Sequence, residues 1–327
     1  AVTWRRRELL EKLLPPGIGA RQRSMPARPL QAIWSRSSMP SVECFIGKAD
    51  VVHGTNYVVP PTRRAGRLVT VYDLTMVHFP ELCHPSSLRF PALIERAVRE
   101  GAHVHVTASA IGEEVAERFG ISADRLHYLP LGIPELPEPS PSPSLLAAPY
   151  ILAVGTAEPR KDLPGLIAAF NLLAQEHQDL RLVHVGPDGW GSEALEQAIA
   201  NSPFKDRIIR TGYLDDASLA RVMKEAELLA YPSIYEGFGF PPLQAMKIGT
   251  PVVASDTAVL RETIGSGGLL VPPGSPESLA DAMASVLDSA EQRTALIEGG
   301  RSQAARFSWE QCGEGLSQIY AKVAQER

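Results

Sequence analysis

Short apolar runs alternate with amphipathic stretches along most of the chain. The runs are rich in Val, Ile and Leu, which is typical of buried parallel strands. They predict strands at 50–53, 68–72, 103–107, 126–129, 150–155, 180–186, 208–211, 228–231 and 251–254. Helical patterns lie between them, for example at 90–100, 112–119, 216–225 and 276–287. This alternation predicts an α/β fold with doubly wound parallel sheets.

A run of prolines and serines divides this pattern in two. It reads Pro-Glu-Leu-Pro-Glu-Pro-Ser-Pro-Ser-Pro-Ser from Pro134 onward and predicts a stiff, unpacked linker. The chain has 327 residues, more than one hydrophobic core usually supports. We therefore predict an N-terminal domain over 1–137, a linker over 138–148, a C-terminal domain over 149–306 and a last helix within 307–327.

Composition is that of an ordinary globular protein, with 44% hydrophobic and 21% charged residues. The three cysteines, Cys44, Cys83 and Cys312, are widely spaced and odd in number, which argues against a disulfide framework and against a zinc site. No apolar run approaches the roughly 20 residues that span a bilayer, and no signal peptide is visible. These features predict a cytoplasmic protein.

Positive charge is concentrated at the start of the chain. The first 70 residues hold 12 Lys or Arg against 4 Asp or Glu, although the whole chain has a net charge of −5. Two interpretations stay open: a solvated basic segment, or a peripheral contact with the inner membrane face, since anionic headgroups attract basic residues by about 1 kcal/mol each. Nucleic-acid binding is disfavoured, because no recognition motif accompanies the charge.

The segment that begins at Glu236 is the first candidate site. A glycine-containing turn follows the carboxylate, and Pro241 and Pro242 suit the first positions of a helix that Gly249 would end. The unpaired N–H groups and the dipole of a helix N-terminus attract anions. An acid beside such a site indicates an enzyme that handles a sugar phosphate or a nucleotide. An ordinary strand-to-helix turn is the alternative.

Arg160 and Lys161 form the second candidate site. They follow an apolar run and precede an apolar-periodic helix that opens at Asp162 or Pro164. A strand-to-helix crossover of this kind is where α/β proteins place their ligands. Arg offers a planar fork for phosphate oxygens, and Lys offers a mobile point charge. A solvated basic pair is the alternative, but the Glu236 segment beside it favours a ligand site.

Together the two segments resemble the retaining, nucleotide-sugar-dependent glycosyltransferases of family 4 (glycosyl transferases group 1), the mannosyltransferases in particular. In that family a strand ends in Gly-Thr and continues through Glu-Pro-Arg-Lys, as at 155–161 here. A motif of Glu, seven residues and Glu follows, and it matches 236–244. Further matches, within a resemblance over about residues 50–320, are Val183-His184-Val185-Gly186, Thr211-Gly212-Tyr213-Leu214, Ala254-Ser255-Asp256, Leu260-Arg261-Glu262 and Leu270-Val271-Pro272-Pro273-Gly274.

The resemblance implies a GT-B fold, in which two Rossmann-like domains face each other across a cleft. Residues 1–137 would form the acceptor-side domain and residues 149–306 the donor domain, with the helix at 307–327 crossing back to the first domain. Family members open with a strand and a glycine-rich loop. Residues 1–4 and Gly17-Ile18-Gly19 are only weak matches to that unit, so we expect this opening βα unit to be missing.

The resemblance also implies the reaction. A sugar would pass, with retention, from a nucleotide-diphosphate donor such as GDP-mannose or a UDP-sugar to a hydroxyl of a glycan or lipid-linked acceptor. No cofactor and no metal are expected, because helix termini and basic side chains would offset the phosphate charge. The implied catalytic residues are Glu236, Asp73 and Tyr72. The implied donor-binding residues are Gly155, Thr156, Arg160, Lys161, Gly212, Tyr213, Gly237, Phe238, Gly239, Phe240 and Gln244.

Two of these residues depart from the family pattern. Gln244 stands where relatives have a second glutamate, which is expected to bind the ribose hydroxyls; glutamine keeps an acceptor but carries no charge. Tyr72 stands where relatives have a histidine beside Asp73, and a tyrosine does not titrate near neutrality. A second hypothesis therefore stays open, a catalytically degenerate homologue that binds a nucleotide or a partner without turnover.

Other conspicuous side chains receive structural interpretations. His103, His105 and His127 alternate with apolar residues in strands and are interpreted as structural. Ser109 follows a strand and precedes a helix, so it is interpreted as the helix cap. Trp190 stands between two glycines and is interpreted as a surface-loop residue, with ligand contact as the alternative.

Overall fold

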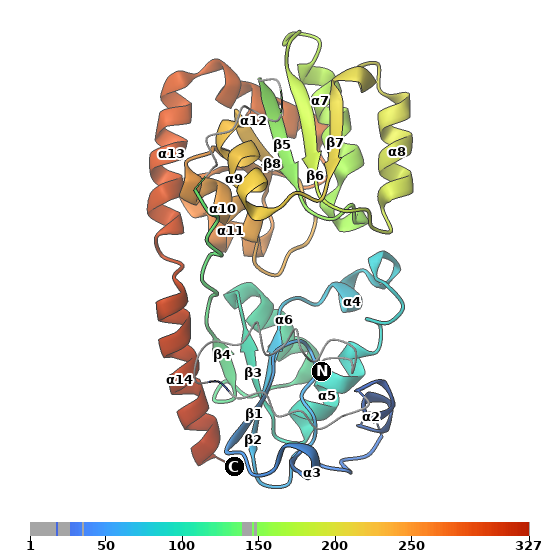
Figure 1. Cartoon of the computed structure of the whole chain (residues 1–327), viewed down its shortest axis with the longest axis vertical. Coiled ribbons are helices and arrows are strands. Elements are labelled where there is room, and N and C mark those ends of the chain that lie inside the picture. Colours follow the sequence, from blue (N-terminus) through green and yellow to red (C-terminus); the bar gives the residue numbers. More distant parts are fainter. Residues whose placement is uncertain (1–17, 19–26, 35, 139–145, 147–148, 327) are drawn as a thin grey trace.

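The computed structural model describes residues 18, 27–34, 36–138, 146 and 149–326, which form two parallel sheets, each with its own helices (Figure 1). The first sheet holds four strands in chain order: β1 (Val51–Gly54), β2 (Gly66–Val71), β3 (His103–Val106) and β4 (Leu126–Tyr128). The helices of this domain are α2 (Ala27–Trp34), α3 (Glu43–Ile46), α4 (Thr75–His78), α5 (Phe90–Arg99) and α6 (Ser109–Phe119).

The second sheet has six parallel strands in the order β10-β9-β8-β5-β6-β7. Its order reverses at β5, which pairs with β6 on one side and with β8 on the other. Open α/β sheets bind ligands at the carboxyl ends of strands beside such a reversal. The strands are β5 (Tyr150–Val154), β6 (Arg181–Val185), β7 (Ile208–Gly212), β8 (Leu228–Tyr231), β9 (Val252–Ser255) and β10 (Leu269–Val271).

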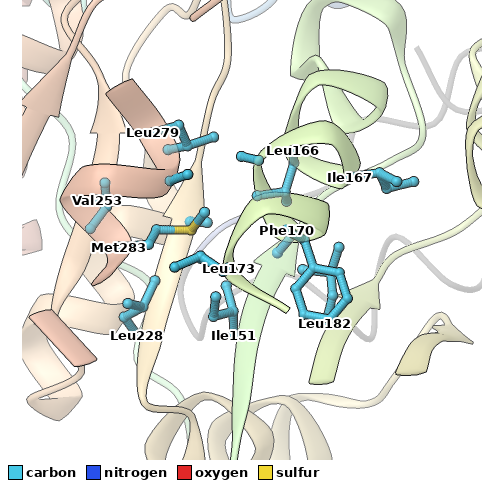
Figure 2. Packing of buried hydrophobic residues seen from close by; sticks show 14 of the residues in the cluster. Ile151, Leu166, Ile167, Phe170, Leu173, Leu182, Leu228, Val253, Leu279 and Met283 are labelled. Carbon is cyan, nitrogen blue, oxygen red and sulfur yellow. The ribbon is translucent and has the colours of Figure 1, made fainter. Parts of the chain in front are cut away.

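Helices cover both faces of the second sheet. On one face, α7 (Leu163–Leu173) and α12 (Pro276–Asp288) bury Phe170 and Met283 against strand residues such as Ile151 (Figure 2). Burial of one such side chain contributes about 1.5–3 kcal/mol. The helices of this domain that remain are α8 (Ser192–Asn201), α9 (Asp216–Glu225), α10 (Phe240–Ile248), α11 (Ala258–Ile264) and α13 (Ala290–Ala304).

The predicted fold class is confirmed, and each predicted strand agrees with the structure to within two residues at either end. The sequence pattern does not predict β10, because its three residues are too short a run to show a period. The helix expected from residue 112 begins earlier, at Ser109. Ser109 is therefore the first helical residue and not the cap, and the N-cap position is held by Ala108 without a side-chain bond.

The last helix, α14 (Trp309–Gln325), leaves the second domain and packs on the first, as the sequence predicts (Figure 1). It lies so close to β2 that a Cβ at Gly66 would be 2.3 Å from the carbonyl oxygen of Val323. Its contact with β1 is polar, since the hydroxyl of Tyr320 lies 2.8 Å from Nδ1 of His53. The helix thus packs against β1 and β2 of the first sheet.

Histidines beneath α14 form a hydrogen-bonded network. Nε2 of His53 lies 2.8 Å from Oγ1 of Thr70, which lies 3.0 Å from Nδ1 of His105. His103 and His127 stack, with Nδ1 of the first 2.9 Å from Nε2 of the second. These contacts agree with the structural interpretation of the three histidines. Burial, together with the charge of a neighbouring histidine, lowers the pKa of both His53 and His127 to about 4.

This network predicts a loss of stability in mild acid. Between pH 6.5 and about 4 the unfolded chain takes up protons at His53 and His127 that the folded protein excludes, so the free energy of unfolding falls as the pH falls. Calorimetric melting should show Tm constant above pH 6.5 and decreasing below it. The double variant His53→Gln/His127→Gln should have a shallower slope, and an unchanged slope would contradict this assignment.

Some predictions lie outside the described residues. They are the strand at 1–4, the glycines of Gly17-Ile18-Gly19 and most of the basic N-terminal cluster. Of the linker at 138–148 only Glu138 and Leu146 are described, so the domain boundaries stay predictions. Within the part of the chain that is described, no helix is both long and apolar enough to cross a membrane.

Candidate active site

The carboxyl ends of β5 and β8 bring the two candidate sites together. After β5 the chain forms one turn of 3-10 helix, Pro159–Lys161, before it enters α7. Of the two residues at which the sequence predicts this helix to open, Asp162 is the N-cap of α7; it has a left-handed conformation (φ 46°), and its side chain accepts a backbone N–H of the first turn. After β8 a short loop leads to Glu236. The N–H of Ile234 in this loop donates to the carbonyl of Arg160 at 2.9 Å, which joins the two segments.

Glu236 lies between both basic residues. Its Oε1 is 2.5 Å from Nζ of Lys161, and its Oε2 is 2.9 Å from Nη1 of Arg160. Glu158 binds the same guanidinium, with 2.8 Å between its Oε2 and Nε of Arg160. The side chains of Lys161 and Glu236 are only 11% and 6% exposed. Two cations and two carboxylates therefore share a largely dry pocket, where loss of one partner of a buried ion pair costs about 3–5 kcal/mol.

The charges of this cluster are strongly coupled. Burial would raise the pKa of Glu236, but Lys161 and Arg160 outweigh it and lower that pKa to about 2. Burial lowers the pKa of Lys161, and Glu236 opposes that shift. For Arg160, burial is outweighed by Glu236 and Glu158, which raise its pKa. Glu236 is thus a firmly ionised carboxylate that occupies two cations of the kind that bind phosphate oxygens.

Two residues at this centre are missed by the sequence analysis. The hydroxyl of Tyr231, at the end of β8, lies 2.6 Å from Nζ of Lys161 and 2.9 Å from Oε1 of Glu236. Ser233 is fully buried and lies near enough to Glu236 to lower its pKa. Tyr231 ends a predicted strand, and Ser233 follows two residues later. The only sequence signal for either residue is its position just before the motif that begins at Glu236.

The turn into α10 has the conformation that its glycines predict. Gly239 is the N-cap, with φ of 92°, and Gly249 ends the helix with φ of 95°, as predicted. Phe238 is 5% exposed and packs against Phe240 and Phe307 in the core. Of Phe238, therefore, only the backbone is available to a ligand.

Gly237 touches the first domain, where Tyr72 and Asp73 follow β2. A Cβ at Gly237 would lie 2.2 Å from the carbonyl oxygen of Tyr72, and Oγ1 of Thr107 donates to the Gly237 carbonyl at 2.9 Å. The predicted catalytic residues Tyr72 and Asp73 therefore lie next to the Glu236 loop. The hydroxyl of Tyr72 donates to the carbonyl of Thr55 at 2.8 Å, within its own domain.

The close approach at Gly237 predicts that adding one methyl group there destabilises the contact between the domains. In Gly237→Ala the Cβ collides with backbone of the opposite domain, so the domains must separate or the loop must shift, at a cost of about 1–3 kcal/mol. We expect a lower Tm and a larger radius of gyration in small-angle scattering. Gly313→Ala in α14 is the control, because its Cβ meets nothing within 4 Å. Equal scattering and Tm for Gly237→Ala and the parent would contradict the contact.

A second contact between the domains involves Glu262 of α11. Its carboxylate accepts the Ser109 N–H at 2.9 Å and the Ser109 hydroxyl at 2.7 Å, and it also faces the N–H of Ala110 at 3.4 Å. These groups lie at the N-terminus of α6, where a negative charge is favourable. The cap of α6 is thus supplied by the other domain, which is why the local prediction for Ser109 is wrong.

Two aromatic residues extend the domain interface. The hydroxyl of Tyr235, next to Glu236, lies 2.6 Å from Oε2 of Glu114 on α6. Trp190 is 50% exposed, and its Nε1 donates to the carbonyl of Leu82 at 2.6 Å. Trp190 is therefore a loop residue, as predicted, but one that binds the opposite domain.

The other predicted donor-binding residues lie around this centre without touching it. Gly155 follows β5 and is the exception, since a Cβ there would lie 3.4 Å from Cε of Lys161. Thr156 comes next in the chain, and Gly212 ends β7. Tyr213 is 75% exposed. Nε2 of Gln244 is 3.4 Å from the carbonyl of Pro134, so its amide faces the segment that leads into the linker. The structure therefore unites Arg160, Lys161 and Glu236, and it leaves Tyr213 and Gln244 apart from them.

The described residues contain no group of three or more His, Cys, Asp or Glu side chains placed to hold a metal ion.

Sequence comparison gives three findings. A family model described as "Glycosyl transferases group 1" matches residues 140–303. O-antigen chain mannosyltransferase B of Escherichia coli is 31% identical over 277 residues, which are 80% of this chain and 71% of that protein. MMP α-(1→4)-mannosyltransferase of Mycolicibacterium hassiacum is 30% identical over 242 residues, which are 72% of this chain and 57% of that protein.

Structural comparison agrees with the sequence matches. Sucrose-phosphate synthase from Thermosynechococcus elongatus superposes with a TM-score of 0.74 at 22% identity. The superposition covers 94% of this chain and 82% of that protein. At this identity the likeness shows the fold alone.

Proposed function

Because the chain belongs to the glycosyl transferases group 1 family and has its GT-B fold, we propose that it transfers a mannosyl group from GDP-mannose to a hydroxyl of a glycan or lipid-linked acceptor. The choice of mannose rests on the two relatives that are mannosyltransferases at about 30% identity. A UDP-sugar is the alternative donor. The basic start of the chain suits an acceptor held near anionic lipid, in a cytoplasmic or peripheral membrane setting.

The buried cluster of Arg160, Lys161 and Glu236 at the strand-order reversal is the observation that carries this proposal. A donor diphosphate would take the two cations, which then stabilise the leaving nucleotide as its charge develops. Glu236 would turn to the hydroxyls of the donor sugar. Backbone N–H groups from Gly237 to Phe240 would hold sugar and phosphate at the start of α10.

The other proposed site residues lie mostly at or just after the carboxyl ends of the strands. Gly155, Thr156, Gly212 and the exposed Tyr213 are proposed to line the nucleotide, with Tyr213 beside the base. Gln244 would reach the ribose once it leaves the carbonyl of Pro134. From the first domain, Tyr72 and Asp73 are proposed to face the donor sugar.

Access to this site requires movement. The side chains of Arg160 and Lys161 are 20% and 11% exposed, and Gly237 packs against the backbone of the first domain at Tyr72. A nucleotide sugar therefore has to part the domains before it reaches the cations, and closure around it would exclude water from the reacting centre.

Calorimetric titration with GDP, UDP and ADP tests the proposal. We expect GDP to bind most tightly, and failure of all three to bind a folded protein would overturn the donor assignment. The binding-only alternative is favoured by one observation, the uncharged Gln244 directed at Pro134. Nucleotide binding without sugar transfer would support that alternative. Restored transfer in Gln244→Glu would then show that the missing carboxylate at position 244 is the cause of the inactivity.

A further inference from the structure

Tyr231 lies at the centre of the Lys161–Glu236 pair, at the carboxyl end of β8. It is 3% exposed, and its hydroxyl is 2.6 Å from Nζ of Lys161 and 2.9 Å from Oε1 of Glu236. The same ammonium lies 4.6 Å from the centroid of the Tyr231 ring. Because a lysine only donates, the hydroxyl accepts from Lys161 and has its own hydrogen free for the carboxylate. Tyr231 thus bonds both members of the ion pair at once.

Binding of the donor diphosphate would deprive Glu236 of its cationic partners. A diphosphate that takes Arg160 and Lys161 removes the two charges that keep this buried carboxylate ionised. A buried carboxylate without partners takes up a proton, because burial disfavours its charge. A protonated or displaced Glu236 would no longer present two acceptor oxygens to sugar hydroxyls.

Two hydroxyl groups would remain beside Glu236 after the diphosphate has bound Arg160 and Lys161. Tyr231 keeps its donated hydrogen bond, since that bond does not depend on the cations. Oγ of Ser233 is fully buried and has no hydrogen-bond partner at normal distance among the described residues, although it lies beside Glu236. A cavity of about 10 Å3, room for roughly one water, adjoins Lys161, Tyr231 and Ser233, so small shifts are possible there.

We infer that Tyr231 is a positioning residue that keeps Glu236 ionised and oriented while the donor diphosphate occupies Arg160 and Lys161. It acts through Glu236 and touches neither the diphosphate nor the sugar. Ser233 supplies the second hydrogen bond to the released carboxylate. This inference rests on the proposed function of the site as a nucleotide-sugar pocket.

Tyr231→Phe tests the inference, because it keeps the ring and removes only the hydroxyl. We expect GDP, or whichever nucleoside diphosphate the parent binds, to bind about tenfold more weakly, since a hydrogen bond to a charged group is lost. Binding should also become coupled to proton uptake. Titration at pH 6.5 in two buffers of different ionisation enthalpy measures that uptake, which should be larger in Tyr231→Phe than in the parent.

Tyr150→Phe is the matched control. Tyr150 is also fully buried in the second sheet, and its hydroxyl donates to the carbonyl of Val222 at 2.8 Å, away from the cluster. It should lose a similar amount of stability with no change in nucleotide affinity or proton uptake. This control separates a general loss of stability from the loss of the hydrogen bond to Glu236.

The double variant Glu236→Gln/Tyr231→Phe completes the test. If Tyr231 acts through the charge of Glu236, its removal should change affinity and proton uptake little once Glu236 is neutral. Equal affinity and equal proton uptake in Tyr231→Phe and the parent would overturn the inference. Failure of the parent itself to bind any nucleoside diphosphate is a different result, which would overturn the proposed function.

Discussion

Lys161→Ala is expected to weaken nucleoside-diphosphate binding by about 100-fold and sugar transfer by about 1,000-fold. The ammonium is the mobile cation of the cluster and is 2.5 Å from Glu236 in a nearly dry site, where a charge interacts more strongly than in water. Its loss leaves Arg160 to balance Glu236, Glu158 and an incoming diphosphate. Calorimetric titration and steady-state kinetics measure the two effects.

Arg293→Ala is the matched control for Lys161→Ala. Arg293 also forms an ion pair within the second domain, with 3.2 Å to Glu227, but that pair lies at the amino end of β8, opposite the site. Its removal should cost some stability and leave nucleotide affinity unchanged. Similar affinity for Lys161→Ala and the parent would contradict the role of Lys161, whatever the control shows.

Glu236→Gln is expected to move binding and turnover in opposite directions. The neutral amide no longer competes for Arg160 and Lys161, so GDP should bind about tenfold more tightly, because Lys161 has then lost its ion pair and Arg160 keeps only the pair with Glu158. Transfer should fall about 100- to 1,000-fold, because an interaction with the reacting sugar is lost. Titration with GDP and initial rates with the sugar donor measure the two effects separately.

The stability of Glu236→Gln provides an independent check. Two buried cations lose their shared anion, so the unliganded variant should be less stable by about 3 kcal/mol. Saturating GDP should raise its Tm by more than it raises the Tm of the parent, because the ligand then supplies the missing negative charge. Weaker GDP binding in the variant than in the parent would contradict the idea that Glu236 occupies the phosphate-binding cations.

Much of the fold can be predicted because its signals are local. The apolar strands and the glycine end of α10 at Gly249 depend on neighbours within a few residues, and both are observed. The sequence predicts the start of α7 at Asp162 or Pro164, and the structure selects Asp162 as its cap. The contact of the Glu236 loop with the Arg160 turn is not local; it follows from the observed strand order, in which β5 and β8 are neighbours.

The missed features depend on contacts between distant segments. Glu262 caps α6 from 153 residues away, and no local pattern at Ser109 carries that information. Tyr231 looks like an ordinary apolar strand residue until the fold places its hydroxyl between Lys161 and Glu236. Gln244 occupies the expected position in its motif, yet its amide faces Pro134, because the segment at 134–138 passes beside α10.

Product analysis is the direct test of sugar transfer by this protein. The protein is incubated with GDP-mannose and, separately, with UDP-glucose, in the presence of mannose-terminated acceptor glycans, and the products are analysed by mass spectrometry and NMR. We expect addition of one hexose from GDP-mannose, with the anomeric configuration of the donor retained, and loss of this product in Lys161→Ala. Tight GDP binding without transfer to an acceptor or hydrolysis of the donor would contradict this expectation and support a binding protein instead.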